Sequence, residues 1–206
     1  TKEQRCDMEN FVLTAVEGLI AMPEYGGRYC SLTPGHTNFI SDAEYQNLVR
    51  TRIAFHDLSA NKHLSAAGIA ADWPHGRGVY ISANKALVIW VGTEDHLRIM
   101  ARSTGTVLNH VFDTLKTALS VIDGFDGIDY ISSDEFGMVT SCPTNIGTGM
   151  RGSVHILVPK LIAKIGFEAI DKLCRERNCQ ARGSSGEHSA VVDRIDVSNW
   201  RRIGFT

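Results

Sequence analysis

The sequence predicts an α+β domain with a largely antiparallel β-sheet flanked by helices. Strand-like segments occur in adjacent pairs, helical segments are interspersed among them, and the strict β-α-β rhythm of a parallel sheet is absent. The chain has 206 residues, of which 43% are hydrophobic and 21% charged, so it is long enough to bury one sizeable core. We therefore expect one domain over residues 1–206.

Four helices are expected, and the segments 3–22 and 107–122 carry apolar residues at the three- and four-residue spacing of an amphipathic helix. Pro23 ends the first of these helices. Ser41 starts the second, because Glu44 follows three residues later and completes a capping box. Pro159 suits the first position of the last helix, where a missing N–H costs nothing. The expected helices cover residues 3–22, 42–52, 107–122 and 160–177.

Strands are expected where apolar or alternating segments lie between turn residues. The polar turn Ala83-Asn-Lys85 joins two such segments into a hairpin, and a third follows closely. Two more flank a loop that contains Gly147 and Gly149. The long connection before the first hairpin, with Gly68 and Pro74, is expected to be an irregular surface loop over residues 56–77. The expected strands cover residues 78–82, 87–91, 97–101, 138–141, 153–158, 180–182 and 190–197.

Composition excludes several classes of function. The formal net charge of −2 argues against a dedicated nucleic-acid binder, whose footprint is usually basic. No apolar run reaches the length needed to cross a bilayer, and no secretory signal is visible, so no membrane partner is expected. The five cysteines lack metal-ligand spacing, and their odd number indicates free thiols in a reducing compartment. We therefore expect a cytoplasmic protein with no protein-bound metal site.

The segment Cys142-Pro-Thr-Asn-Ile-Gly-Thr-Gly-Met-Arg151 carries the most chemistry in the chain. It places a thiol, a guanidinium, two hydroxyls and two glycines within ten residues, directly before a strand. Glycine allows backbone shapes that other residues resist, and proline fixes a turn. A thiol near cations is held partly as thiolate, and an arginine fork suits phosphate oxygens. The alternative is a hairpin loop with an inert cysteine.

Two further segments carry acidic residues. Glu94 follows the strand at 87–91, where a side chain projects from the rim of a sheet; a solvated acid in a charged turn is an equal alternative on composition alone. Glu187 lies in Arg182-Gly-Ser-Ser-Gly-Glu-His188, and the composition of this segment alone indicates an exposed loop.

In this order, the segments Asp72-Trp-Pro-His-Gly-Arg-Gly78, Leu87-Val-Ile-Trp-Val-Gly-Thr-Glu-Asp-His-Leu-Arg98, the cysteine loop and the Gly-Glu-His loop resemble the catalytic domain of the phosphagen (ATP:guanidino) kinases. The resemblance covers nearly the whole chain and is greatest to arginine kinases. It implies an antiparallel sheet flanked by helices, similar to glutamine synthetase. It also implies reversible transfer of the ATP γ-phosphoryl group to arginine or a related guanidino compound, with ATP or ADP and Mg²⁺ as cofactors.

The resemblance assigns four residues to the guanidino substrate. Glu94 and Glu187 match the two glutamates that clamp and orient the guanidinium, which would hold it in a near-attack pose. Cys142 would contact the same group, in an orienting and electrostatic role rather than as a covalent catalyst. Thr144 would hydrogen-bond the sulfur.

The resemblance assigns a second group to the nucleotide. Arg98, Arg151 and Arg182 match arginines that contact its phosphates, and transfer of a phosphoryl group depends mainly on such charge neutralisation. Backbone N–H groups from Gly183 onward would add a phosphate nest. His155 aligns with a histidine of the adenine pocket, although a lone strand histidine is more often simply packed. Magnesium would be held mainly by phosphates and water.

Parts of the family pattern are missing from the sequence. The small N-terminal helical domain, an early Ser-x-Arg-x-Arg strand and the final helix are absent, so the domain is expected to be incomplete and its activity alone to be low. Arg50-Thr-Arg52 has a similar pattern of arginines, but it lies at the end of a predicted helix and is not counted as that strand. A catalytically silent kinase-like module, acting as a scaffold or nucleotide-binding subunit of a larger assembly, is the alternative function. The family contains monomers, dimers and octamers, so oligomeric state stays open.

Overall fold

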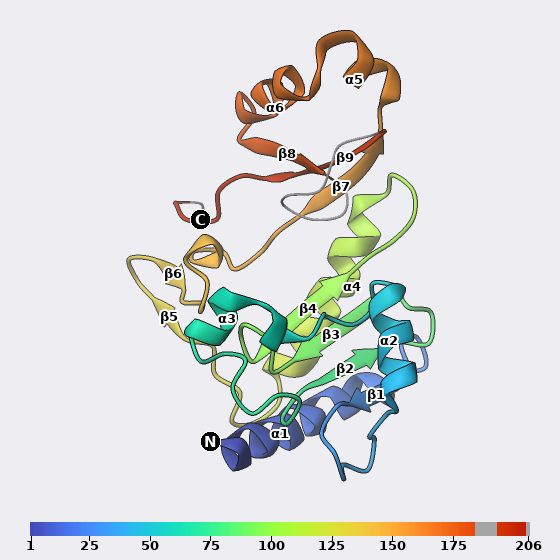
Figure 1. Ribbon diagram of the computed structural model, residues 1–206, viewed down its shortest axis with the longest axis vertical. Helices are drawn as coiled ribbons and strands as arrows, with labels where there is room; N and C mark the ends of the chain where they lie inside the picture. Colours follow the sequence, from blue (N-terminus) through green and yellow to red (C-terminus); the bar gives the residue numbers. More distant parts are fainter. Residues whose placement is uncertain (184–192, 205–206) are drawn as a thin grey trace. The chain divides into compact units, whose positions relative to one another are not determined.

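A computed structural model describes residues 1–183 and 193–204 of the chain (Figure 1). These residues form two compact units, of which the first is Thr1–Asp129 and the second begins at Tyr130. Every pairing between named strands in the described residues is antiparallel. The predicted combination of helices with antiparallel sheet is therefore confirmed.

The first unit is built on a four-stranded sheet in the order β1-β2-β3-β4. The strands are β1 (Arg28–Ser31), β2 (Gly78–Ile81), β3 (Leu87–Val91) and β4 (Leu97–Ala101). The predicted strands at 87–91 and 97–101 have the observed bounds, and the one at 78–82 is one residue shorter. β1 was not predicted, because four residues are too few to show an alternating pattern.

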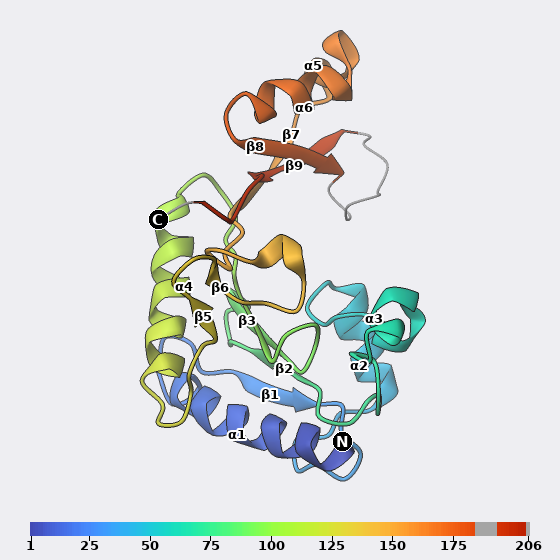
Figure 2. The ribbon, with the colours of Figure 1, turned by 90° about the vertical axis from the view of Figure 1, so that its left-hand side faces the viewer.

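Helices cover both faces of this sheet (Figures 1 and 2). The long helices α1 (Lys2–Ile20) and α4 (Leu108–Asp123) contact each other and bury side chains with Tyr80 and Ile89. On the opposite face, α2 (Asp42–Arg50) packs with Val79 and Val88. Neighbouring residues of β2 and β3 thus enter different cores, as the pleat of a strand requires. None of the described helices combines the length and apolar character needed to cross a membrane.

The prediction of an irregular loop over residues 56–77 was wrong in part. This connection contains a 3₁₀ turn, η1 (Leu58–Ala60), and a short helix, α3 (Lys62–Ala66). The side chain of Asn61 caps α3 by accepting hydrogen bonds from the backbone N–H groups of His63 and Leu64. A single turn of helix is too short to show periodicity, so the cap was its only sequence signal.

The second unit contains a small hairpin and a three-stranded sheet. The hairpin pairs β5 (Ser132–Ser133) with β6 (Gly137–Met138), followed by the 3₁₀ turn η2 (Pro143–Asn145). The sheet has the order β7-β9-β8 and consists of β7 (Ser153–Leu157), β8 (Cys179–Gly183) and β9 (Arg194–Asn199). The predicted strand at 138–141 was therefore wrong over most of its length, because only Met138 of that range lies in a strand.

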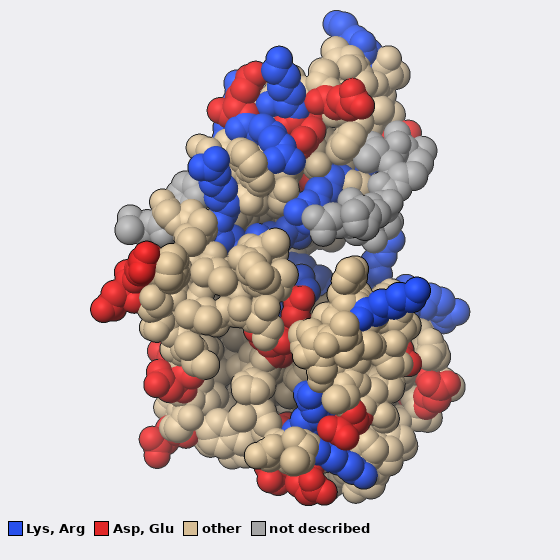
Figure 3. Space-filling model, turned by 60° about the vertical axis from the view of Figure 1, so that its left-hand side comes forward, with Lys and Arg blue, Asp and Glu red and all other residues tan. Residues whose placement is uncertain are grey.

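Two helices accompany this second sheet, where the sequence predicted one. α5 (Pro159–Ile165) and α6 (Phe167–Arg175) are separated by Gly166, whose φ of 78° interrupts the helix. Ile170 of α6 packs with Ala181 and Ile195 of the sheet to form the buried centre of this unit. Basic and acidic side chains are interspersed over the helical surface of this unit (Figure 3), in keeping with the small net charge.

Candidate active site

The residues singled out from the sequence fall into both units. Glu94 and Arg98 belong to the first unit, on the β3–β4 hairpin. The second unit holds Cys142, Thr144, Arg151, His155, Arg182 and Gly183. Glu187 lies outside the described residues.

Glu94 lies in the turn of a hairpin whose base is closely packed. The backbone N–H of Gly92 donates to the carbonyl of His96 at 3.0 Å and closes the turn. Gly92 has a φ of +68°, and a Cβ at this position would lie 2.1 Å from the carbonyl oxygen of Gly76. Thr93 is buried and Glu94 is half-buried. The sequence therefore fixes the turn at its base while leaving the Glu94 carboxylate accessible.

Arg98 lies opposite Trp90 in the register of β3 and β4. Its guanidinium carbon is 5.2 Å from the centre of the Trp90 ring, a cation–π contact. The indole Nε1–H of Trp90 donates to the carbonyl of Ile53 at 2.6 Å, and Phe55 meets the ring edge-on at 5.4 Å. Trp90 is thus held on two sides and serves as a platform for an exposed cation.

Cys142 precedes η2 and is held by both neighbouring threonines. Its sulfur lies 3.0 Å from Thr144 Oγ1, which is the hydrogen bond that the sequence predicted. Thr140 Oγ1 donates to the Cys142 carbonyl at 2.8 Å. Pro143 occupies the first position of the 3₁₀ turn, where its fixed φ is suitable. The thiol is half-buried, so a bound molecule can contact it.

The rest of the cysteine loop is anchored to two other segments. Gly147 exchanges two backbone hydrogen bonds with Met138. The Thr148 N–H donates to the Arg202 carbonyl at 3.0 Å, and Arg202 Nη1 donates to the Thr144 carbonyl at 2.7 Å. A Cβ at Gly147 would lie 2.2 Å from the Arg202 carbonyl oxygen, so this approach requires glycine. The loop around Cys142 is therefore fixed by contacts on both sides.

A row of polar side chains crosses the three-stranded sheet. Asp196 on the central strand β9 pairs in register with His155 on β7 and with Arg182 on β8. Arg151 donates to Asp196 Oδ2 through Nη2, and His155 Nε2 lies 3.8 Å from Oδ1. Arg182 also donates to Gln180 Oε1 at 3.2 Å. The fold thus brings together three residues that the sequence analysis assigned to the nucleotide.

Asp196 is the functional candidate that the sequence reasoning missed. Its side chain is only 10% exposed, and within the described residues no hydrogen-bond donor reaches its Oδ1 atom. A buried carboxylate oxygen without a donor is unusual, because burial without compensation is costly. The available signal was an acid between Ile195 and Val197 of a predicted strand, and its partners are visible only from the strand register. Gly183, next to Arg182, is buried and pairs with Ile195 at the end of β8.

This set of residues suits a phosphate-bearing ligand. Arg151 keeps 29% of its side chain exposed although it is paired, so its fork can still meet an anion. The described ranges 1–183 and 193–204 contain no group of three or more His, Cys, Asp or Glu side chains placed to hold a metal ion.

Comparison with known proteins decides the family. A family model described as ATP:guanido phosphotransferase, C-terminal catalytic domain, matches residues 7–206 and so spans both units. The chain belongs to the ATP:guanido phosphotransferase family. The similarity inferred from the cysteine loop and the Glu-Asp-His segment is thereby confirmed.

Relatives within this family are mostly arginine kinases. Arginine kinase Oct f 2 of Amphioctopus fangsiao is 37% identical over 206 residues, covering 100% of this chain and 55% of that protein. A taurocyamine kinase of Schistosoma mansoni is 35% identical over 207 residues, covering 100% of this chain and 26% of the relative. The chain therefore spans about half the length, or less, of these relatives.

Solved structures of the family share the fold. The duplicated taurocyamine kinase from Schistosoma mansoni with bound transition state analog components matches with a TM-score of 0.82 and 32% identity, over 99% of this chain and 26% of that one. A lombricine kinase crystal structure matches with a TM-score of 0.83 and 27% identity, over 100% of this chain and 55% of that one.

Proposed function

We propose that the protein containing this chain transfers the γ-phosphoryl group of ATP reversibly to a guanidino compound. The family match over residues 7–206 is the observation that carries this proposal. The local geometry supports it, because Cys142 and Thr144 form a fixed thiol–hydroxyl pair and Arg151 and Arg182 accompany a buried carboxylate in one sheet.

The guanidino side of the reaction needs orientation and a proton acceptor. A guanidinium is a weak nucleophile because it is protonated and delocalised. Glu94 and Glu187 would bind its N–H groups, align the attacking nitrogen with the γ-phosphorus and accept the proton released when the N–P bond forms. Cys142, with its sulfur fixed by Thr144, would contact the same guanidinium and stabilise its position electrostatically.

The phosphate side of the reaction needs positive charge. Arg98, Arg151 and Arg182 would neutralise the charge that develops on the transferred phosphoryl group and on ADP. The N–H of Gly183 would bind phosphate oxygen, and His155 would contact the adenine ring. Magnesium, held mainly by the phosphates and water, would reduce the repulsion between phosphate oxygens.

Arginine is the substrate that we propose first. The Gly-Glu-His loop at 186–188 resembles the corresponding loop of arginine kinases, and several similar relatives carry that name. Taurocyamine and lombricine kinases among the related proteins define the alternative substrates to be tested. We also place the protein in the cytoplasm, because all five cysteines are free thiols.

A coupled assay on the full-length protein tests the proposal. ADP formation is measured with arginine, taurocyamine, lombricine and creatine, and transfer to arginine is expected to be fastest. Glu94→Gln should lower kcat by about 100-fold or more, since it removes a proton acceptor, while Glu24→Gln on an exposed turn serves as the matched control. Absence of turnover with every guanidino compound would reject the proposal, and nucleotide binding without turnover would favour the silent module.

A further inference from the structure

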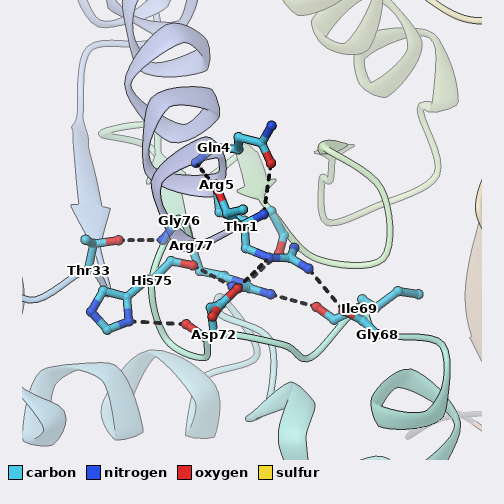
Figure 4. A network of polar contacts seen from close by, with 11 residues as sticks. Thr1, Gln4, Arg5, Thr33, Gly68, Ile69, Asp72, His75, Gly76 and Arg77 are labelled. Carbon is cyan, nitrogen blue, oxygen red and sulfur yellow. Dashed lines mark hydrogen bonds and ion pairs between the residues drawn. The ribbon is translucent and has the colours of Figure 1, made fainter.

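Arg77 is a fully buried cation at the start of β2 (Figure 4). Its guanidinium donates to three backbone carbonyls, those of His75 at 2.5 Å, Ile69 at 2.6 Å and Gly92 at 3.1 Å. Burial lowers its pKa to about 10, and the nearby positive charge of Arg5 acts in the same direction. The side chain therefore stays charged at neutral pH.

The third of these carbonyls belongs to the hairpin that carries Glu94. Gly92 uses its N–H to close the turn with His96 and its C=O to accept from Arg77 Nε, so both of its polar groups are engaged. Its positive φ and its close approach to the Gly76 carbonyl leave no space for a Cβ at this position. Glu94 follows only two residues later. A change in the position of the Gly92 carbonyl would therefore be passed to the Glu94 backbone.

The backbone that precedes Arg77 is hydrogen-bonded to a network that reaches α1. The Gly76 N–H donates to Thr33 Oγ1 at 2.7 Å, and Thr33 donates in turn to the buried carboxylate of Glu9 on α1 at 2.5 Å. Figure 4 shows Arg5, also from α1, reaching the same connection, where it donates to the Gly68 carbonyl at 3.0 Å. Arg77 thus links the connection between α3 and β2, which is hydrogen-bonded to α1, with the turn of the β3–β4 hairpin.

We propose that Arg77 is a positioning residue for the guanidino substrate: its guanidinium sets the geometry of the turn that presents Glu94. This inference rests on the role proposed above for Glu94. Lysine would keep the positive charge but lacks the planar fork that reaches three carbonyls in different directions. A displacement of about 1 Å at a substrate-orienting group is enough to lower rates by about 100-fold.

The test uses the full-length protein with Arg77→Lys, and Tyr80→Phe as the matched control. Tyr80 is also fully buried in β2, and its hydroxyl donates to the backbone carbonyl of Gly26, so the control removes one buried donor in the same strand. Five quantities are measured for each variant: kcat and KM for arginine, the Kd for MgADP, the melting temperature, and hydrogen exchange of the Gly92 amide.

The expected result is specific to one substrate. Arg77→Lys should lower kcat/KM for arginine about 10- to 100-fold, leave the Kd for MgADP within about twofold, and speed exchange of the Gly92 amide about tenfold. Tyr80→Phe should lower the melting temperature without these changes. Equal losses for both substrates in Arg77→Lys, or the same pattern in Tyr80→Phe, would show that Arg77 is only structural.

The exchange measurement separates this inference from the proposed function. If the wild-type protein phosphorylates no guanidino compound, the proposed function fails, and Gly92 exchange alone decides whether Arg77 controls the turn. If the wild-type protein is active but Arg77→Lys leaves both kcat/KM and Gly92 exchange unchanged, the proposed function stands and the positioning role of Arg77 is overturned.

Discussion

The carboxylate of Asp196 is ion-paired with the guanidinium of Arg151, although the two residues lie 45 positions apart in the sequence. The pair joins the residue that follows the cysteine loop to the central strand of the second sheet. Arg151 is therefore held in place before any ligand binds. Preorganised charges of this kind stabilise a transferring phosphoryl group without reorganisation during the reaction.

Asp196→Asn should weaken nucleotide binding. The substitution removes the charge that orients Arg151 and leaves its side chain to be ordered by the ligand, which should raise the Kd for MgADP about tenfold. Titration calorimetry on the full-length protein measures this change. Glu44→Gln removes the partner of the exposed Arg28 in the first unit and should leave the Kd unchanged. An unchanged Kd for Asp196→Asn would contradict the proposed role of Arg151.

Gly147→Ala should unfold the cysteine loop. The added Cβ would lie 2.2 Å from the Arg202 carbonyl oxygen, and the φ of +115° is also unfavourable for alanine. Gly35 separates the two effects, because its φ is +85° but no atom lies within 4 Å of the added Cβ. Gly35→Ala should cost about 1 kcal/mol of unfolding free energy, and Gly147→Ala clearly more. Urea unfolding compares the two variants, and equal costs would mean that the Arg202 contact is unimportant.

Glu9→Gln should destabilise the first unit. The buried carboxylate accepts hydrogen bonds from Tyr29, Ser31 and Thr33, and an amide replaces one acceptor oxygen by a donor. Hydrogen bonds to a buried charged group contribute about 1.5–3 kcal/mol each, so a loss of at least that size is expected in urea unfolding. Glu17→Gln, on an exposed position of the same helix, should change stability by less than about 0.5 kcal/mol. Similar losses in both variants would contradict this account.

The free energy of unfolding should fall in alkaline solution, between about pH 10 and pH 12. Burial raises the pKa of Tyr80 to about 12, and burial together with the charges of Asp57 and Asp42 raises that of Tyr45 to about 12. An unfolded tyrosine loses its proton near pH 10, so above that pH the unfolded chain binds fewer protons than the native one and is favoured. Stability is full below this window and declines through it.

Tyr80→Phe provides the control for this pH dependence. Phenylalanine has no proton to lose, so the variant should lose less stability than the wild type between pH 9 and pH 11. Urea midpoints at a series of pH values give the comparison. An identical slope for the two proteins would show that the Tyr80 hydroxyl does not contribute.

Local signals were sufficient for the strands of the β2–β3 and β3–β4 hairpins. The strands at 87–91 and 97–101 could be placed because polar turn residues separate two mostly apolar segments. The single helix predicted over 160–177 is split in two, because the positive φ of Gly166 interrupts the helical backbone. Asp196 was missed because its role depends on register with His155 and Arg182, which no local pattern encodes. The placement of Glu187 stays a prediction.

The order of the second sheet also has a consequence for synthesis on the ribosome. β9 lies between β7 and β8 in the sheet but follows both in the sequence. A nascent chain that has already released His155 and Arg182 still lacks the strand that joins them. The nucleotide affinity that we propose for this unit should therefore arise in one step during translation, when Asp196 leaves the exit tunnel, rather than growing gradually.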